Sequence, residues 1–205
     1  ILDTKAKVYL QKDDLAKAIE PQEAALKLAD QFGYWDENTT LPNLLLLAQR
    51  IYAEAINVKD KPAQTAMVNR AAVYLKRWLD SSKKPTPEST MFYAQILYSQ
   101  ATANPEKLNH DLLKQARDVI EKGMRQAIHP KEGFYQLLLA MIQQENYWRA
   151  SSELLELMVS LFPAKRDYWP PLMQCYLQLA NDKDPAKARE AYLRAINTIE
   201  RAQAL

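Results

Sequence analysis

The chain has 205 residues, and only three of them are glycine: Gly33, Gly123 and Gly133. Loops that cradle a dinucleotide or a phosphate need several glycines close together, because the backbone must approach the ligand or adopt positive φ; these three are too widely spaced. The net charge of +2 provides no electrostatic footprint for nucleic acid or an anionic membrane. No apolar run approaches the roughly 20 residues of a transmembrane helix.

Proline and asparagine or aspartate residues interrupt the chain at intervals, and the segments between them place apolar residues at i, i+3, i+4 and i+7. No segment alternates with period two for long enough to predict a strand. Pro21 lies inside the second helical segment and should kink or split it. The pattern predicts helices over 2–11, 14–32, 41–57, 63–81, 88–102, 109–128, 132–145, 148–161, 167–180 and 185–202.

The last third of the chain contains an internal repeat of paired helices. Phe134 begins the run F-Y-Q-L-L-L-A-M, and Trp169 begins W-P-P-L-M-Q-C-Y, 35 residues later. Each run is followed by a second helix with small residues at regular spacing, Ala150 in one unit and Ala188 in the other. Both large aromatic residues are therefore predicted to be buried anchors of their units.

This pattern resembles the tetratricopeptide repeat, W-x2-L-G-x2-Y…A-x3-F…P, a pair of antiparallel helices of about 34 residues. The resemblance implies an all-α fold in which helical pairs stack as a right-handed superhelical solenoid over 1–205. Upstream units are longer than the nominal repeat, so HEAT-like or other helical-pair arrays stay open as alternatives. The expected units are 1–38, 39–84, 85–130, 131–165 and 166–205, and the chain opens in mid-pattern, as a fragment of a longer protein would.

In such an array the first helix of each pair lines a concave face. Glutamine can pair with a peptide backbone as donor and acceptor, and tyrosine supplies contact area at little entropy cost. A mixed groove of this kind suits a peptide or a helix of a protein partner, although part of the set could instead pack against neighbouring helices. The predicted partner-binding groove consists of Gln49, Tyr52, Glu132, Tyr135, Gln136, Gln143, Asp167, Gln174 and Gln178.

The sequence gives little support for catalysis. His110 and His129 are not spaced as metal ligands, and Cys175 has no neighbouring base that could activate it. We therefore expect no catalytic residues, no metal and no cofactor. An enzyme using a groove carboxylate, Glu132 or Asp167, is the weakest alternative. The Lys, Arg and Asn residues with which chaperone-binding tetratricopeptide domains clamp a terminal carboxylate are missing from the readable groove positions.

A narrower resemblance covers Gly133–Ala140, Ala150–Pro163 and Asp167–Trp169. These segments are similar to the tetratricopeptide proteins that accompany TonB, ExbB and ExbD in Gram-negative bacteria, where the runs are F-Y-Q-L-L-L-A, L-E-x-M-V-x-x-x-P and Y-W. The resemblance implies a periplasmic scaffold that is an accessory of TonB-dependent energy transduction. The alternative is a cytosolic regulator or assembly factor whose effector domain lies outside this fragment. Neither possibility requires nucleic acid or membrane insertion of these residues.

Overall fold

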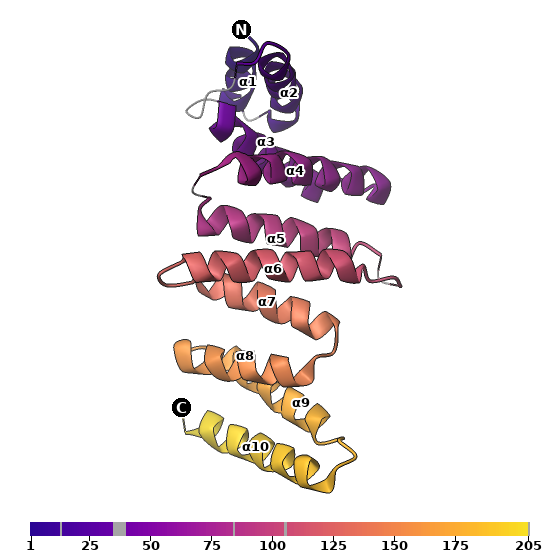
Figure 1. Ribbon diagram of the computed structural model, residues 1–205, viewed down its shortest axis with the longest axis vertical. Helices are drawn as coiled ribbons and strands as arrows, with labels where there is room; N and C mark the ends of the chain where they lie inside the picture. Colours follow the sequence, from indigo (N-terminus) through magenta and orange to yellow (C-terminus); the bar gives the residue numbers. More distant parts are fainter. Residues whose placement is uncertain (13, 35–39, 84, 105, 205) are drawn as a thin grey trace. The chain divides into compact units, whose positions relative to one another are not determined.

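A computed structural model describes residues 1–12, 14–34, 40–83, 85–104 and 106–204. These residues form ten α-helices and one 3-10 turn, with no strand among them (Figure 1). The elements are α1 (Leu2–Gln11), α2 (Leu15–Gln31), α3 (Thr40–Asn57), α4 (Lys61–Ser81), α5 (Pro87–Ala101), α6 (His110–Gln126), α7 (Glu132–Gln144), α8 (Trp148–Leu161), η1 (Arg166–Tyr168), α9 (Trp169–Leu179) and α10 (Pro185–Gln203).

All ten predicted helices are present, and their ends lie within two residues of the predicted ones. Capping chemistry explains this agreement at three helices that begin with proline at N1 or N2. The side chains of Asp60, Thr86 and Asp184 each accept a hydrogen bond from a backbone N–H in the first turn of α4, α5 and α10. Proline lacks an N–H that would be unpaired there in any case, so the cap and the proline together fix where the helix starts.

Pro21 does not split the second helix, one of the two outcomes predicted for it. α2 runs without interruption from Leu15 to Gln31 with Pro21 inside it. Pro21 and Gln22 are buried, as are Ile19 and Leu26 on either side. Packing of this face against the core stabilises the continuous helix and outweighs the single backbone hydrogen bond that proline removes.

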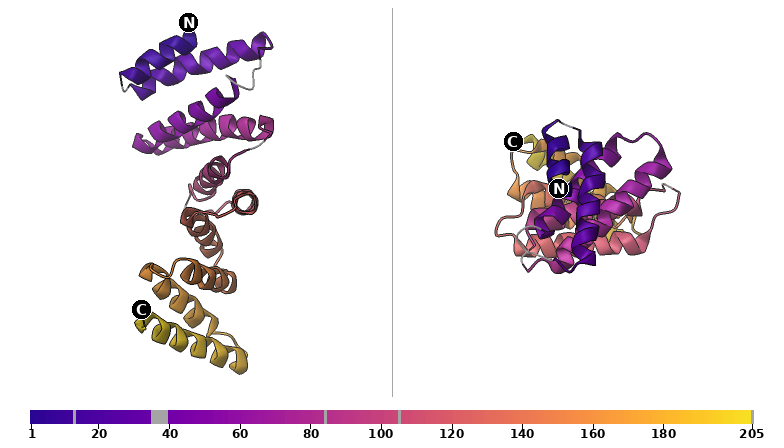
Figure 2. Two further views of the ribbon diagram at one scale, coloured as in Figure 1. Left: turned by 90° about the vertical axis from the view of Figure 1, so that its left-hand side faces the viewer. Right: turned by 90° about the horizontal axis from the view of Figure 1, so that it is seen from above.

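The described residues divide into two compact units, Ile1–Gly123 and Met124–Leu205. In the first unit α1 packs on α2, α2 on α3, α3 on α4 and α4 on α5, so the helices from α1 to α5 contact one another in chain order. Figure 2 shows α1 with α2 and α3 with α4 as antiparallel hairpins. The core between α2 and α5 contains Leu44, Leu47, Ile51, Leu75 and Ile96, all fully buried. The expected single solenoid of five pairs over 1–205 stays a prediction.

The second unit repeats this arrangement: α7 packs on α8, α8 on α9, and α9 on α10. Phe134 and Trp169, the predicted anchors, are 1% and 8% exposed. Leu155 of α8 and Leu172 of α9 are fully buried as well. The aromatic anchors could be predicted because they recur at the same place in two helical pairs.

Candidate functional site

Most of the predicted groove residues have side chains that solvent can reach. On the first helices of the second unit, Gln136, Asp167 and Gln174 are exposed, and Glu132, Gln143 and Gln178 are half-buried. On α3 of the first unit, Gln49 is exposed and Tyr52 is half-buried. Within each unit, the polar positions predicted from helical spacing therefore lie at the surface of the first helices.

A polar cluster ties α7 to the turn that precedes α9. The Tyr168 hydroxyl donates a hydrogen bond to Glu132 Oε1, and Gln136 Nε2 donates to the Tyr168 oxygen at 2.7 Å. Gln136 Nε2 also lies 3.2 Å from Glu132 Oε1, and Lys165 Nζ lies 3.6 Å from Glu132 Oε2. Two of the predicted groove residues are thus brought together, and their side chains are held in fixed positions.

Tyr168 is the residue of this cluster that the groove prediction missed. Its side chain is 7% exposed, and burial raises the pKa of the hydroxyl, with the hydrogen bond to Glu132 as a further cause. The phenol therefore stays protonated and acts as a hydrogen-bond donor. The signal in the sequence was the Tyr-Trp pair at the start of the last repeat, of which only the tryptophan was interpreted as an anchor.

Tyr135 does not belong to the exposed groove, which corrects the prediction for this residue. It is 7% exposed, and its ring packs edge-on against Phe162, with the ring centroids 5.8 Å apart. The ring of Phe162 also lies next to the ring of Tyr168, with the ring centroids 6.5 Å apart. Phe162 follows the last residue of α8, so the chain leaving that helix brings an aromatic ring over Tyr135 and buries it.

Tyr52 is partly committed to packing as well. Its ring meets Phe92 of α5 edge-on, with centroids 5.3 Å apart. The remaining surface of Tyr52 lies one turn along α3 from the exposed Gln49. In the first unit, the candidate surface is therefore an amide beside the accessible part of an aromatic ring.

Charged residues on the second helices of the first unit pair with one another across the stack. Arg70 of α4 makes a two-pronged ion pair with Glu23 of α2, and Arg77 makes one with Asp30. Tyr74 Oη donates a hydrogen bond to Glu23 at 2.9 Å. Burial of the Tyr74 hydroxyl is the main cause that raises its pKa to about 12, and the hydrogen bond to Glu23 is the second. These groups hold α2 against α4 and satisfy one another, so they have a structural role.

A similar arrangement lies on the second helices of the second unit. Glu156 of α8 accepts from Arg201 of α10 at 3.0 Å and from the Tyr176 hydroxyl at 2.9 Å. A hollow of about 490 Å³ that Tyr176 also lines is bordered by charged side chains that include Arg149, Glu190 and Arg194. Arg149 pairs with Glu153 and Arg194 with Glu190, each one turn away. The hollow is therefore lined by salt-bridged residues.

The described residues contain no arrangement that is typical of catalysis. No group of three or more His, Cys, Asp or Glu side chains that could hold a metal occurs among them. Cys175 is 1% exposed, and burial raises its pKa to about 11, so the thiol is protonated at neutral pH. His110 begins α6 and His129 lies in the following loop, both at the surface. None of the described helices is long and apolar enough to cross a bilayer.

The fold is similar to solved structures of helical repeat proteins. A crystal structure of MamA protein aligns with a TM-score of 0.62 at 13% identity, covering 98% of this chain and 87% of that chain. A second MamA crystal structure aligns with a TM-score of 0.59 at 14% identity, covering 98% of this chain and 97% of that chain. The crystal structure of a Podosopora anserina putative kinesin light chain with nearly identical TPR-like repeats aligns with a TM-score of 0.51 at 14% identity. The alignment covers 99% of this chain and 92% of that chain.

These likenesses show the fold: the chain is an all-α protein built from tetratricopeptide-like helical repeats, as predicted. The sequence matches no family model and no curated protein. What the chain does must therefore be argued from its own side chains.

Proposed function

We propose that the chain is a non-catalytic protein-protein interaction scaffold that binds a peptide or a helix of a partner along the exposed faces of its first helices. The observation that carries this proposal is that each of the two units has accessible amides on its first helices. Gln49, Gln136 and Gln174 are exposed, and Gln143 and Gln178 are half-buried. Apolar residues of the same helices are buried beneath them, so the amides stand on a packed support.

Exposed amides of this kind have the chemistry to bind a polypeptide backbone. Each glutamine offers two N–H donors and a carbonyl acceptor, which matches the alternating groups of an extended peptide or the free ends of a helix. Leu177, which is 37% exposed, lies between Gln174 and Gln178 and adds apolar area. The Glu132, Gln136 and Tyr168 cluster is already ordered, so a ligand there would lose less side-chain entropy.

A pair of variants tests this proposal. Gln174→Ala removes an exposed groove amide on α9, whereas Arg149→Ala removes an exposed side chain on α8, a second helix. The tagged wild type and both variants are used to purify partners from the cells that produce the protein. We expect Gln174→Ala to recover at least tenfold less of the main partner and Arg149→Ala to recover an unchanged amount. Equal recovery by all three proteins would overturn the groove assignment.

A narrower version of the proposal follows from the segments Gly133–Ala140, Ala150–Pro163 and Asp167–Trp169. It assigns the chain to the periplasm, as an accessory of the TonB, ExbB and ExbD system. Cell fractionation of the natural full-length protein, followed by purification of its partners from the envelope fraction, tests it. Recovery of TonB-system components supports the narrower version. Recovery of cytosolic partners alone would favour the alternative, a cytoplasmic regulator or assembly factor.

A further inference from the structure

A small hollow of about 220 Å³ lies between α2, α3 and α4 of the first unit. Its apolar lining comes from Ala16 and Ile19 of α2 and from Met67 of α4, and its acidic lining comes from Glu20 of α2 and Glu54 of α3. Pockets that enclose a drug-sized ligand measure roughly 300–1,000 Å³, so this smaller hollow suits a single side chain. It combines apolar surface with acidic groups.

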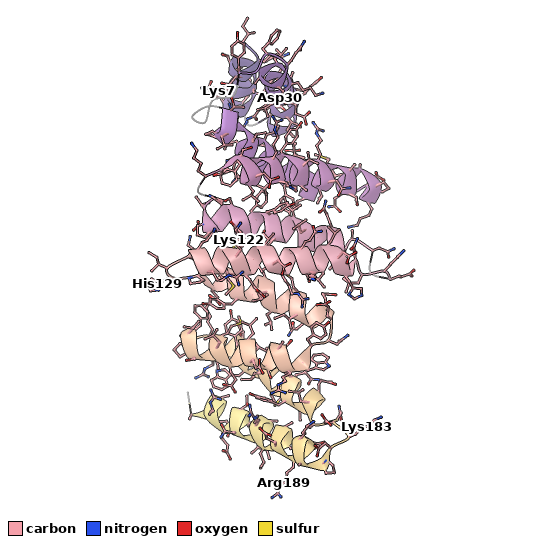
Figure 3. All side chains as sticks on the ribbon, in the orientation of Figure 1. Lys7, Asp30, Lys122, His129, Lys183 and Arg189 are labelled. Carbon is pink, nitrogen blue, oxygen red and sulfur yellow. The ribbon has the colours of Figure 1, made fainter. Side chains whose placement is uncertain are left out.

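A regular series of ion pairs between α2 and α4 stops at this hollow. Glu23 of α2 pairs with Arg70 of α4. Asp30, which is labelled in Figure 3, pairs with Arg77 two turns further along both helices. Seven residues before Glu23, the matching position of α2 is Ala16, whose short side chain cannot form a third pair. The hollow therefore lies where the next pair of the series would be.

The two glutamates that line the hollow are not neutralised by the chain itself. Glu20 is exposed and Glu54 is half-buried, and neither has an ion-pair partner among the described residues. Arg70 also lines the hollow, but its guanidinium is already bound to both oxygens of Glu23. The hollow therefore carries an excess of negative charge, which favours a cationic occupant.

The second unit has hollows at the corresponding place, between the second helices α8 and α10 and beside Tyr176 of α9. Three glutamates line them, and each is paired with an arginine of the chain; the pairs are Glu153–Arg149, Glu156–Arg201 and Glu190–Arg194. In the part of the first unit that the structure describes, no arginine pairs with Glu20 or Glu54. The hollow of the first unit therefore lacks the kind of cation that its counterparts contain.

We infer that this hollow receives an arginine side chain of a protein partner. The guanidinium donates hydrogen bonds to the carboxylates of Glu20 and Glu54, and its methylene groups lie against Ile19 and Met67. Arginine fits better than lysine because its five N–H donors can serve carboxylates from two helices and its charge is more weakly hydrated. This contact is additional to the exposed amides of the first helices, and its test does not depend on them.

A titration of the 205-residue chain with Nα-acetyl-arginine methylamide tests this inference, with isotope-labelled methionine methyl groups observed by NMR. Met67 is one of six methionines, so its signal reports on the hollow and the other five are internal references. We expect the Met67 signal to shift saturably, and Met67→Leu identifies this signal. Nα-acetyl-citrulline methylamide, which has nearly the same shape but no charge, should leave it unchanged.

Removal of charge identifies the two carboxylates. Glu20→Gln combined with Glu54→Gln should weaken binding of the arginine derivative about tenfold, because both ion pairs are lost, and should leave helicity unchanged. Glu153→Gln combined with Glu190→Gln removes two carboxylates from the second unit and is the matched control, which should bind like the wild type. An unmoved Met67 signal, an equal shift with the citrulline derivative, or undiminished binding by the first double variant would overturn the inference. Tighter binding of the matching lysine derivative would overturn the choice of arginine.

Discussion

Individual side chains divide the predicted groove into residues that pack and residues that are available to a partner. Tyr135 of α7 and Gln174 of α9 are both predicted to lie in the groove, yet only Gln174 is exposed. The ring of Phe162 packs edge-on against Tyr135, whereas solvent reaches the side chain of Gln174. The amides, rather than the buried tyrosine, are therefore the candidate contacts.

This pair of residues provides a direct prediction. Tyr135→Ala should lower the free energy of unfolding by about 3 kcal/mol, because it removes a buried aromatic ring and leaves a cavity. Gln174→Ala should change it by less than about 0.5 kcal/mol, as is usual for surface substitutions. Chemical denaturation of both variants measures these values. A Tyr135→Ala protein as stable as the wild type would show that the ring is not part of the core.

The buried thiol of Cys175 predicts a loss of stability at alkaline pH. The folded protein holds this proton up to a pKa of about 11, whereas the ordinary value is 9.0. Between these two pH values the unfolded chain binds fewer protons than the folded one, so unfolding becomes more favourable as the pH rises. Denaturation midpoints at pH 8, 9, 10 and 11 should fall across this window, and Cys175→Ala should reduce the fall. An equal fall in the variant would assign the effect to other groups.

At the scale of helices, the sequence predicted local structure well and contacts between helices poorly. Capping residues such as Asp60 and Thr86 act within four residues, so the ends of their helices could be predicted. The pairing of Glu23 with Arg70 spans 47 residues and depends on how α2 packs against α4. Charges on these helices would look like an ordinary solvated face in the sequence. The burial of Tyr135 by Phe162 was hidden for the same reason.

The two ion pairs between α2 and α4 should differ in strength. The side chain of Glu23 is 14% exposed and binds both Arg70 and Tyr74, whereas the side chain of Asp30 is 40% exposed. We expect Glu23→Ala to lower the free energy of unfolding by about 1–2 kcal/mol and Asp30→Ala by less than about 1 kcal/mol. Urea denaturation of the two variants compares them. A larger effect of Asp30→Ala would contradict the ranking by burial.

At the scale of the whole molecule, the repeat fold could be inferred because each helical pair is incomplete alone. One pair exposes an apolar face, and the next helix along the chain covers it, as α9 does for α8. Leu193 and Ile196 of α10 are 58% and 53% exposed, and the sequence pattern alone did not distinguish them from the buried apolar residues of earlier helices.

The scarcity of glycine also fits this architecture. Gly33 adopts a φ of +69° just after α2, a left-handed conformation that glycine tolerates and other residues rarely adopt. Gly123 is buried inside α6 and Gly133 lies in the first turn of α7. All three have structural positions, and the candidate site is made of side chains on helices.

Site-specific photo-crosslinking tests the scaffold proposal most directly. A benzophenone amino acid is introduced at Gln174 on α9 in one protein and at Arg149 on α8 in another, and both proteins are irradiated in the cells that produce them. The account predicts that Gln174 crosslinks to one or a few defined partner proteins and that Arg149 does not crosslink to them. Crosslinking of those partners from Arg149 but not from Gln174 would contradict it, because the binding face would then lie on the second helices.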